Sequence, residues 1–126
     1  MTLGALPVLG NLLVLAVSNN SVTTNNITSI TDNASNTWAR AIGSTAAVGY
    51  SESELWYAYN VTPHGSSHIV TLNQSVAGAT NQVNVDEFSG IATVSPLDKT
   101  SWVDTASSAT VNAGPTATLS QANELV

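Results

Sequence analysis

The stretch Glu54–Val61, with the sequence ELWYAYNV, is the clearest strand signal in the chain and the one that decides the fold class. Its bulky side chains fall on both faces of a strand, since successive residues of a strand point to opposite sides. A strand of this kind lies in the centre of a sheet or meets a partner on its outer face. The face that we expect to enter the core carries Leu55, Tyr57, Tyr59 and Val61. Trp56, on the other face with Glu54, is a candidate anchor for a subunit interface or a ligand.

Outward from this strand, short runs of strand-forming residues recur at fairly even spacing between clusters of turn-forming residues. Leu12–Val17 is continuously apolar, as expected of a strand covered on both faces. Further strands are expected at Asn26–Thr31, Thr37–Ile42, Ser67–Ser75 and Gln82–Phe88, with weaker signals at Ala106–Val111 and Ala117–Ser120. No apolar stripe of useful length follows the period of a helix, so almost no helix is expected. The pattern predicts an all-β antiparallel β-sandwich.

The alternation within two of these runs assigns faces to their side chains. In Ser67–Ser75, Val70 and Leu72 are expected to point inward and Ile69, Thr71 and Asn73 outward. In Thr37–Ile42, regular alternation places Trp38, Arg40 and Ile42 on one face.

The composition excludes several classes of function. The chain has 126 residues, which suits one domain, and carries 2 basic and 8 acidic side chains for a net charge of −6. With Arg40 and Lys99 as its basic residues, it cannot form the basic surface that binds nucleic acid or an anionic membrane. No stretch has the roughly 18 apolar residues in a row that a membrane span requires. Asn, Ser and Thr make up 45 of the residues, so hydroxyls and amides replace ions as the polar groups of the surface.

Several segments in matching order resemble a known family. They are Gly10–Val14 (GNLLV), Thr31–Trp38 (TDNASNTW), Glu54–Asn60 (ELWYAYN), Asp86–Asp98 (DEFSGIATVSPLD) and Gln121–Leu125 (QANEL). The family is an uncharacterised β-sandwich module, immunoglobulin-like or jelly-roll-like, of secreted and cell-surface bacterial proteins. The resemblance implies an antiparallel sandwich located outside the cytoplasm. The matching residues belong to turns and to the core, so the resemblance implies no particular chemistry.

The chain departs from the family pattern at its ends. We therefore expect an extended N-terminal segment of residues 1–10 and a sandwich domain of residues 11–126. In the family a further strand begins at the equivalent of residues 123–126. A sandwich without that strand has an open hydrophobic edge. The apolar segment Thr2–Leu9 is a candidate donor strand for such an edge in a neighbouring copy. The candidate interface residues are Leu3, Leu6, Val8, Leu9 and Trp56.

Two alternatives to the donor strand stay open at this stage. The run 1–18 has the apolar character of a signal peptide, although it lacks a positively charged start and Pro7, Gly10 and Asn11 interrupt it. The sequence is also compatible with a fragment of a longer protein.

Asparagine in the N-glycosylation pattern Asn-x-Ser/Thr is the densest motif of the chain. An Asn- and hydroxyl-rich sequence contains several matches by chance, so the motif alone is weak evidence of modification. We place Asn19 and Asn33 in turns and Asn73 on an outward face, which makes these three the preferred acceptors. The other two matches are Asn26 and Asn60.

No set of residues in the sequence forms a recognisable catalytic or metal-binding motif, and we expect no enzyme activity and no cofactor. Cysteine is absent. His64 and His68 are four residues apart in a Pro/Gly turn, where this spacing does not bring two ligands to one metal. The acidic residues Asp86, Glu87, Asp98 and Asp104 lack the spacing of a calcium loop. Lys99 lies in a turn, where solvent exposure is expected in place of a crosslink to asparagine.

Together these observations predict a structural subunit of an extracellular filament or surface assembly, built by strand complementation and sheet packing. Its partners would be copies of itself, forming a homopolymer, and glycans. The alternative is a non-catalytic carbohydrate- or surface-binding module of a larger secreted protein, in which exposed aromatic rings stack on sugars.

Overall fold

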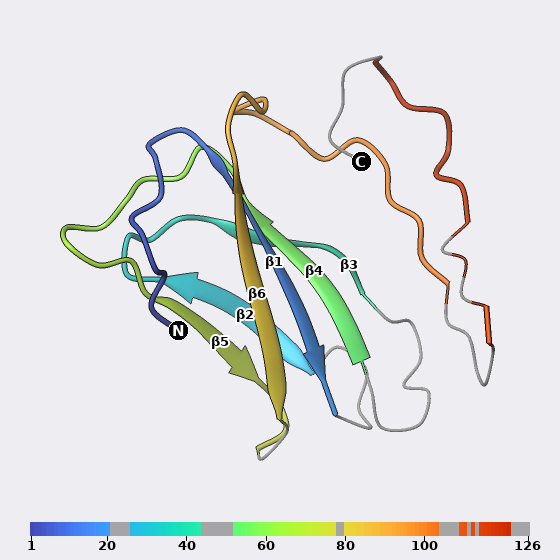
Figure 1. Cartoon of the computed structure of the whole chain (residues 1–126), viewed down its shortest axis with the longest axis horizontal. Helices are drawn as coiled ribbons and strands as arrows, with labels where there is room; N and C mark the ends of the chain where they lie inside the picture. Colours follow the sequence, from blue (N-terminus) through green and yellow to red (C-terminus); the bar gives the residue numbers. More distant parts are fainter. Residues whose placement is uncertain are drawn as a thin grey trace.

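The chain folds into two packed antiparallel sheets (Figure 1). This computed structural model describes residues 1–20, 26–43, 52–77, 80–103, 109–110, 112 and 114–121. The strands are β1 (Leu12–Asn19), β2 (Ile27–Asp32), β3 (Trp38–Gly43), β4 (Glu52–Ala58), β5 (Val70–Gln74) and β6 (Asn81–Phe88). The larger sheet has the order β3-β4-β1-β6, and the smaller pairs β2 with β5. The predicted all-β antiparallel sandwich is confirmed, and the described residues contain no helix, so none that could cross a membrane.

Strand β1 is the centre of the larger sheet, as its continuous apolar sequence predicts. Leu15 lies opposite Trp56 of β4 on one side and Val85 of β6 on the other. Leu13, Leu15 and Val17 point between the sheets and are 1%, 0% and 2% exposed. Burial of an aliphatic side chain of this size contributes about 1.5–3 kcal/mol to stability.

Side chains from both sheets form the core in two clusters. The larger cluster contains Leu15, Val17, Ile27, Ile30, Trp56 and Val70, and the smaller contains Leu13, Ala58 and Val61. Leu3, Trp38 and Val85 pack against both clusters, so they join the two into one hydrophobic core.

Strand β4 has the opposite orientation from the one that its sequence predicts. Trp56 and Ala58 are buried, at 7% and 0% exposed, whereas Leu55 is 38% exposed on the outer face. Pairing with β1 fixes this register, because Trp56 lies directly opposite the inward-pointing Leu15. Of the residues predicted to face inward, Val61 alone is fully buried, and it enters the core beyond the end of the strand.

A bulge in β3 explains why Ile42 does not lie on the face that regular alternation predicts. Trp38 and Arg40 lie opposite Ala58 and Trp56 of β4, but the register shifts before Ile42, which pairs with the outward-facing Leu55. Ile42 is therefore not on the face of Trp38 and Arg40, because an extra residue in one strand reverses the faces that follow it.

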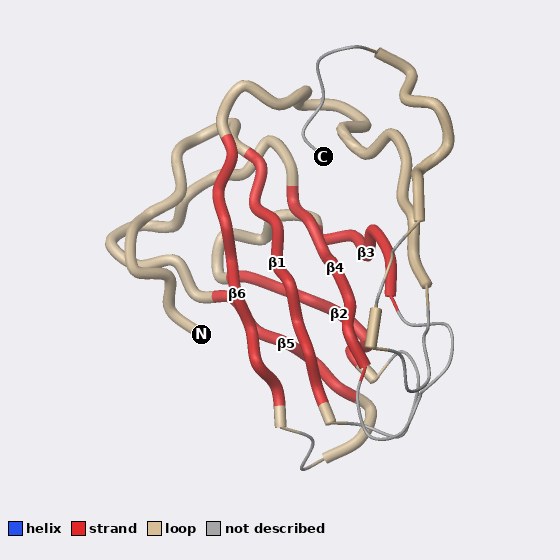
Figure 2. Tube along the Cα trace, turned by 45° about the vertical axis from the view of Figure 1, so that its right-hand side comes forward, coloured by secondary structure: helices blue, strands red, loops and turns tan. Residues whose placement is uncertain are grey.

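The strand prediction is correct for β5, whereas the weaker signals near the C-terminus do not form described strands. In β5 the expected faces are confirmed, since Val70 is fully buried and Leu72 packs on the core, while Ile69 is 40% exposed. The segment 117–120 is not a strand, and residues 91–103 and 114–121 run as loop beside the larger sheet (Figure 2). Of the weak signal Ala106–Val111, residues 106–108 and 111 lie outside the described part of the chain, and residues 109–110 form no strand.

Candidate functional site

The start of the chain pairs with strand β5 of the same molecule. Thr2 and Ile69 form an antiparallel bridge. The Leu3 N–H donates to the His68 carbonyl at 2.9 Å, and the Val70 N–H donates to the Met1 carbonyl at 2.8 Å. The Leu3 side chain packs against both core clusters. The first residues of the candidate donor segment thus add to the edge of the smaller sheet in their own chain.

The rest of this segment crosses the end of the sandwich and leaves apolar side chains in solvent. Leu6, Val8 and Leu9 are 41%, 61% and 69% exposed. The Val8 N–H donates to the Glu87 carboxylate of β6 at 2.6 Å, and the Gly10 N–H donates to the Val61 carbonyl at 2.9 Å. The exposed apolar group therefore lies beside the end of the edge strand β6. Of the five candidate interface residues, Leu6, Val8 and Leu9 lie on the surface, Leu3 is partly buried, and Trp56 lies in the core.

Two carboxylates of β4 point into the sandwich, where sequence reasoning placed no acid. Glu52 and Glu54 are each 1% exposed. Glu52 Oε2 accepts from the Asn26 N–H at 3.1 Å and from Asn19 Nδ2 at 3.4 Å. Both donors come from segments far from Glu52 in the sequence, so its buried position depends on the tertiary fold.

Glu54 is held by an indole and a guanidinium. Its Oε2 accepts from Trp56 Nε1 at 2.7 Å and lies 3.8 Å from Arg40 Nη1. The Arg40 guanidinium also lies 6.0 Å from the centre of the Trp56 ring, so it bridges the acid and the aromatic face. Burial raises the pKa of Glu54 above its usual value, and the nearby Glu52 carboxylate adds to this, while the Trp56 and Arg40 contacts oppose it.

Replacing Glu54 with glutamine is expected to raise the free energy of unfolding at neutral pH, because burial disfavours the ionised carboxylate more than its contacts with Trp56 and Arg40 favour it. The amide removes a desolvated charge but keeps an oxygen that accepts from Trp56 Nε1. Because the pKa of Glu54 is raised in the folded state, its protonated form contributes stability below about pH 4.5, and this stability is lost as the pH rises through the raised pKa. Urea unfolding across this pH range should therefore show a flatter profile for Glu54→Gln. A variant with the pH profile of the parent chain would contradict this role.

Asp32, at the end of β2, organises the turn that leads into β3. Its Oδ1 accepts from the Ala34 and Asn36 N–H groups, both at 3.0 Å. Its Oδ2 accepts from Asn36 Nδ2 at 3.0 Å and from Trp38 Nε1 at 2.9 Å, and lies 3.3 Å from Nε2 of the fully buried His68. Burial alone raises the pKa of Asp32, but the hydrogen bonds from Asn36 and Trp38 outweigh it, and the pKa is lowered.

The two histidines of the Pro/Gly turn have different surroundings. His68 is buried against Asp32, whereas His64 lies on the surface with its Nδ1 2.9 Å from Asn33 Nδ2.

Among the described residues, no group of three or more acids and histidines is arranged to hold a metal ion. Asp98 instead accepts from Ser120 and Lys99, and these hydrogen bonds lower its pKa. Asp104 lies outside the described residues.

Two of the five sequon asparagines are inside the folded domain. Asn19 is the last residue of β1 and not a turn residue, and it is 3% exposed. Asn26 is fully buried, and its Oδ1 accepts from Ser75 Oγ and from the Val76 N–H. A glycan on either nitrogen would have to be attached before folding, so neither is an acceptor in the folded chain.

The other three sequon asparagines are exposed. Asn33 uses its amide nitrogen in contacts with His64 and the Ser67 carbonyl, at 2.9 and 3.1 Å. Asn60 has a positive φ of 51°, a conformation that asparagine tolerates better than most residues. Asn73 lies on the outer face of β5, where its Nδ2 donates to Ser29 Oγ at 3.0 Å. The outward orientation predicted for Asn73 is confirmed, which keeps it as a candidate acceptor.

Comparison with protein-family models, with curated proteins and with solved structures gives no match for this chain. The architecture alone therefore defines its class, which is an all-β domain with two antiparallel sheets. The resemblance to β-sandwich modules is supported at this level, and no family is identified.

Proposed function

We propose that the chain is a structural, non-catalytic subunit of an extracellular assembly, in which segment Thr2–Leu9 of one copy completes the sandwich of the next. The observation that carries the proposal is the pairing of Thr2 with Ile69, with Leu3 seated on the core. This edge of β5 accepts the segment in the same molecule. A neighbouring copy has the same segment, so it can offer the same backbone and side-chain contacts.

Exchange of the segment breaks contacts that the neighbouring copy can restore. Within one molecule the pairing with β5 consists of one bridge, the two backbone hydrogen bonds that flank it and a bond from the Met1 ammonium to the Val70 carbonyl. The Leu3 side chain also has to leave the core, and the Val8 N–H has to leave the Glu87 carboxylate. Residues 4–10 contain two glycines and link the paired residues to β1. If each copy gives its segment to the next, the contact is heterologous and generates an open filament, whereas reciprocal exchange closes a dimer.

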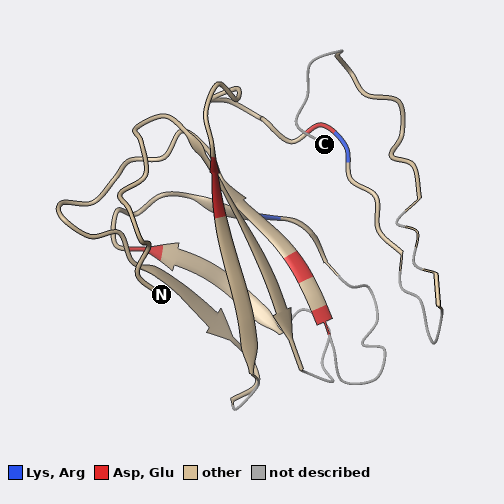
Figure 3. Cartoon of the chain, in the orientation of Figure 1, with Lys and Arg blue, Asp and Glu red and all other residues tan. Residues whose placement is uncertain are grey.

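The charge distribution favours close approach of copies. Figure 3 shows how few charged residues are spread along the described chain, and two of the acidic ones, Glu52 and Glu54, are buried. Neighbours that meet over hydroxyls and amides avoid much of the desolvation cost of buried ions. The exposed Leu6, Val8 and Leu9 add apolar area at the end of the sandwich where the segment leaves it.

A disulfide trap tests whether the segment pairs within a molecule or between molecules. The flanking bonds, Leu3 to His68 and Val70 to Met1, make Thr2 and Ile69 a non-hydrogen-bonded pair, whose Cα atoms lie at about 4.5 Å. This separation suits a disulfide, and the chain has no native cysteine. Oxidation of the double variant Thr2→Cys, Ile69→Cys should give a ladder of covalent oligomers on a non-reducing gel.

The matched control is the pair Thr2→Cys with Val94→Cys. Val94 is 75% exposed, lies on the loop beyond β6, and should give no ladder. Internal bonds alone at every protein concentration in the Thr2/Ile69 variant would contradict the proposal. A monodisperse monomer of the parent chain in sizing and negative-stain imaging would contradict it independently.

A further inference from the structure

The outer face of the larger sheet contains a trough that the assembly contacts do not use. Its floor is formed by the small residues Ala16 and Ser18 of β1. In the register of the sheet, Ala16 lies between Leu55 of β4 and Asn84 of β6. Ser18 lies in the same way between Ser53 and Gln82. Small side chains in the central strand, with Leu55 on one side and Gln82 and Asn84 on the other, make a groove along β1.

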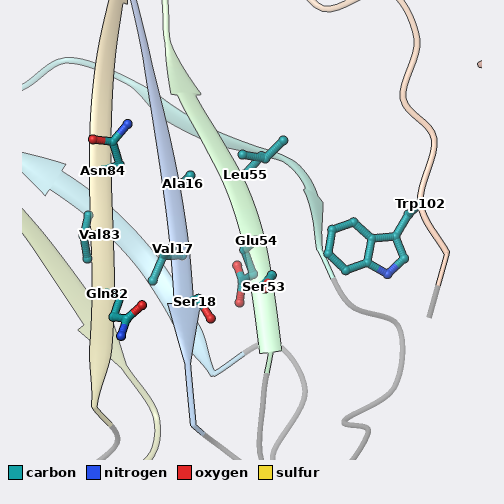
Figure 4. Close-up of a pocket in the computed structure, with 10 residues that line it drawn as sticks. All are labelled: Ala16, Val17, Ser18, Ser53, Glu54, Leu55, Gln82, Val83, Asn84 and Trp102. Atoms are coloured by element: carbon teal, nitrogen blue, oxygen red, sulfur yellow. The ribbon is translucent and has the colours of Figure 1, made fainter. Parts of the chain in front are cut away.

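Trp102 completes the trough from outside the sheet. It lies on the loop beyond β6, and its indole points toward the β4 side of the groove (Figure 4). The cavity has a volume of about 460 Å³, within the range of roughly 300–1,000 Å³ that small-molecule sites occupy. Val17, Glu54 and Val83 also border it, but they belong to the opposite face of the sheet, and the Glu54 side chain is fully buried.

The surface of the trough is mainly apolar, with Leu55 and the flat ring of Trp102, and its polar groups are neutral hydrogen-bonding side chains. Asn84 Nδ2 donates to Asp86 Oδ2 at 2.5 Å, which leaves the amide oxygen as the acceptor that Asn84 offers to a ligand. Gln82 provides both a donor and an acceptor, and Ser18 and Ser53 provide hydroxyls. The outward-facing side chains of the trough carry no charge.

We propose that this trough binds a neutral saccharide. One sugar ring stacks on Trp102, and hydroxyls of the saccharide form hydrogen bonds with the Gln82, Asn84 and serine side chains. The ring of a sugar has an apolar face that packs on an indole, while its edge carries the hydroxyls that amides and serines recognise. An anionic sugar fits poorly, because the site has no cation, Asp86 lies in the next row of the sheet, and the chain has a net charge of −6. This site lies apart from the β5 edge, so it does not depend on the proposed assembly.

Binding is tested by calorimetric titration of the folded chain with short glucan, xylan, mannan and chitin oligosaccharides and, as an anionic comparison, oligogalacturonate. At least one neutral oligosaccharide should bind saturably, and Trp102→Ala should weaken it about tenfold or more, equivalent to about 1.4 kcal/mol. Trp102→Phe, which keeps a flat ring, should retain much of the affinity. Ala16→Leu should also abolish binding, because it fills the floor of the trough.

Val103→Ala is the matched control, since Val103 is the next residue, is 40% exposed and does not border the trough. Thermal unfolding of each variant separates loss of binding from loss of fold. Absence of binding to every neutral oligosaccharide at millimolar concentration would overturn the proposal. Equal affinity of Trp102→Ala and the parent chain, or preference for oligogalacturonate, would overturn it as well.

Discussion

Replacing Asp32 with alanine is expected to lower the free energy of unfolding by about 3–4 kcal/mol, measured by urea unfolding at neutral pH. The carboxylate accepts four hydrogen bonds, from the backbone of Ala34 and Asn36 and from the side chains of Asn36 and Trp38. Its side chain is fully buried, so the alanine variant leaves these donors without their acceptor and without full access to water. Most domains have only about 5–15 kcal/mol of stability, and a loss of this size is a large part of it.

Two further variants show whether the effect comes from the negative charge of Asp32 or from its buried, hydrogen-bonded position. Asp86→Ala removes an exposed carboxylate from β6 and should change stability by about 0.5 kcal/mol or less. Asp32→Asn keeps one acceptor oxygen and should cost less than alanine. Because the pKa of Asp32 is lowered, its contribution is present above about pH 3.8 and is lost as the pH falls through the lowered value. Asp32→Asn should therefore weaken the acid dependence, and an Asp32→Ala loss no larger than that of Asp86→Ala would contradict the assignment.

Replacing Trp56 with alanine is expected to cost about 3–5 kcal/mol, through a cavity in the larger core cluster. Trp56 lies opposite Leu15, is 7% exposed, and donates to Glu54. Loss of the indole also removes the close hydrogen-bond donor of a buried carboxylate, which adds to the cost. The same urea unfolding, followed by the remaining tryptophans, measures the change.

Leu55→Ala is the matched control, because Leu55 is the preceding residue on the opposite face of β4. It is 38% exposed, and its truncation should cost about 1 kcal/mol or less. The comparison tests the orientation of the strand directly. If Leu55→Ala were the more destabilising of the two, β4 would have the orientation that its sequence alone predicts.

The orientation of β4 shows where sequence reasoning reaches its limit in this fold. Its existence as a strand can be predicted from ELWYAYNV, but its two faces have similar apolar content. The register against β1 decides between them, because it places Trp56 opposite the inward-pointing Leu15 and turns Glu52 and Glu54 toward Asn19, Asn26 and Arg40. These residues lie on other strands or next to them, and a single segment of sequence does not show that they converge.

The candidate sites also differ in whether a single segment of sequence is enough to predict them. The segment Thr2–Leu9 could be selected from its apolar composition, because strand addition depends mainly on backbone and apolar side chains. The trough could not be predicted in this way. It depends on the strand register that aligns Ala16 with Leu55 and Asn84, and on the position of the loop that carries Trp102. Asp32 begins a run of turn-forming residues, Asp32–Asn36, and nothing local indicates that His68 lies against it.

The position of β1 between β4 and β6 has a consequence for folding during synthesis. The central strand obtains its neighbours from residues 52–58 and 81–88, so most of the sheet contacts join distant parts of the chain. Such a high contact order slows folding, because long loops must close before the pairs can form. During synthesis the larger sheet can therefore be completed only after residues 81–88 have been made.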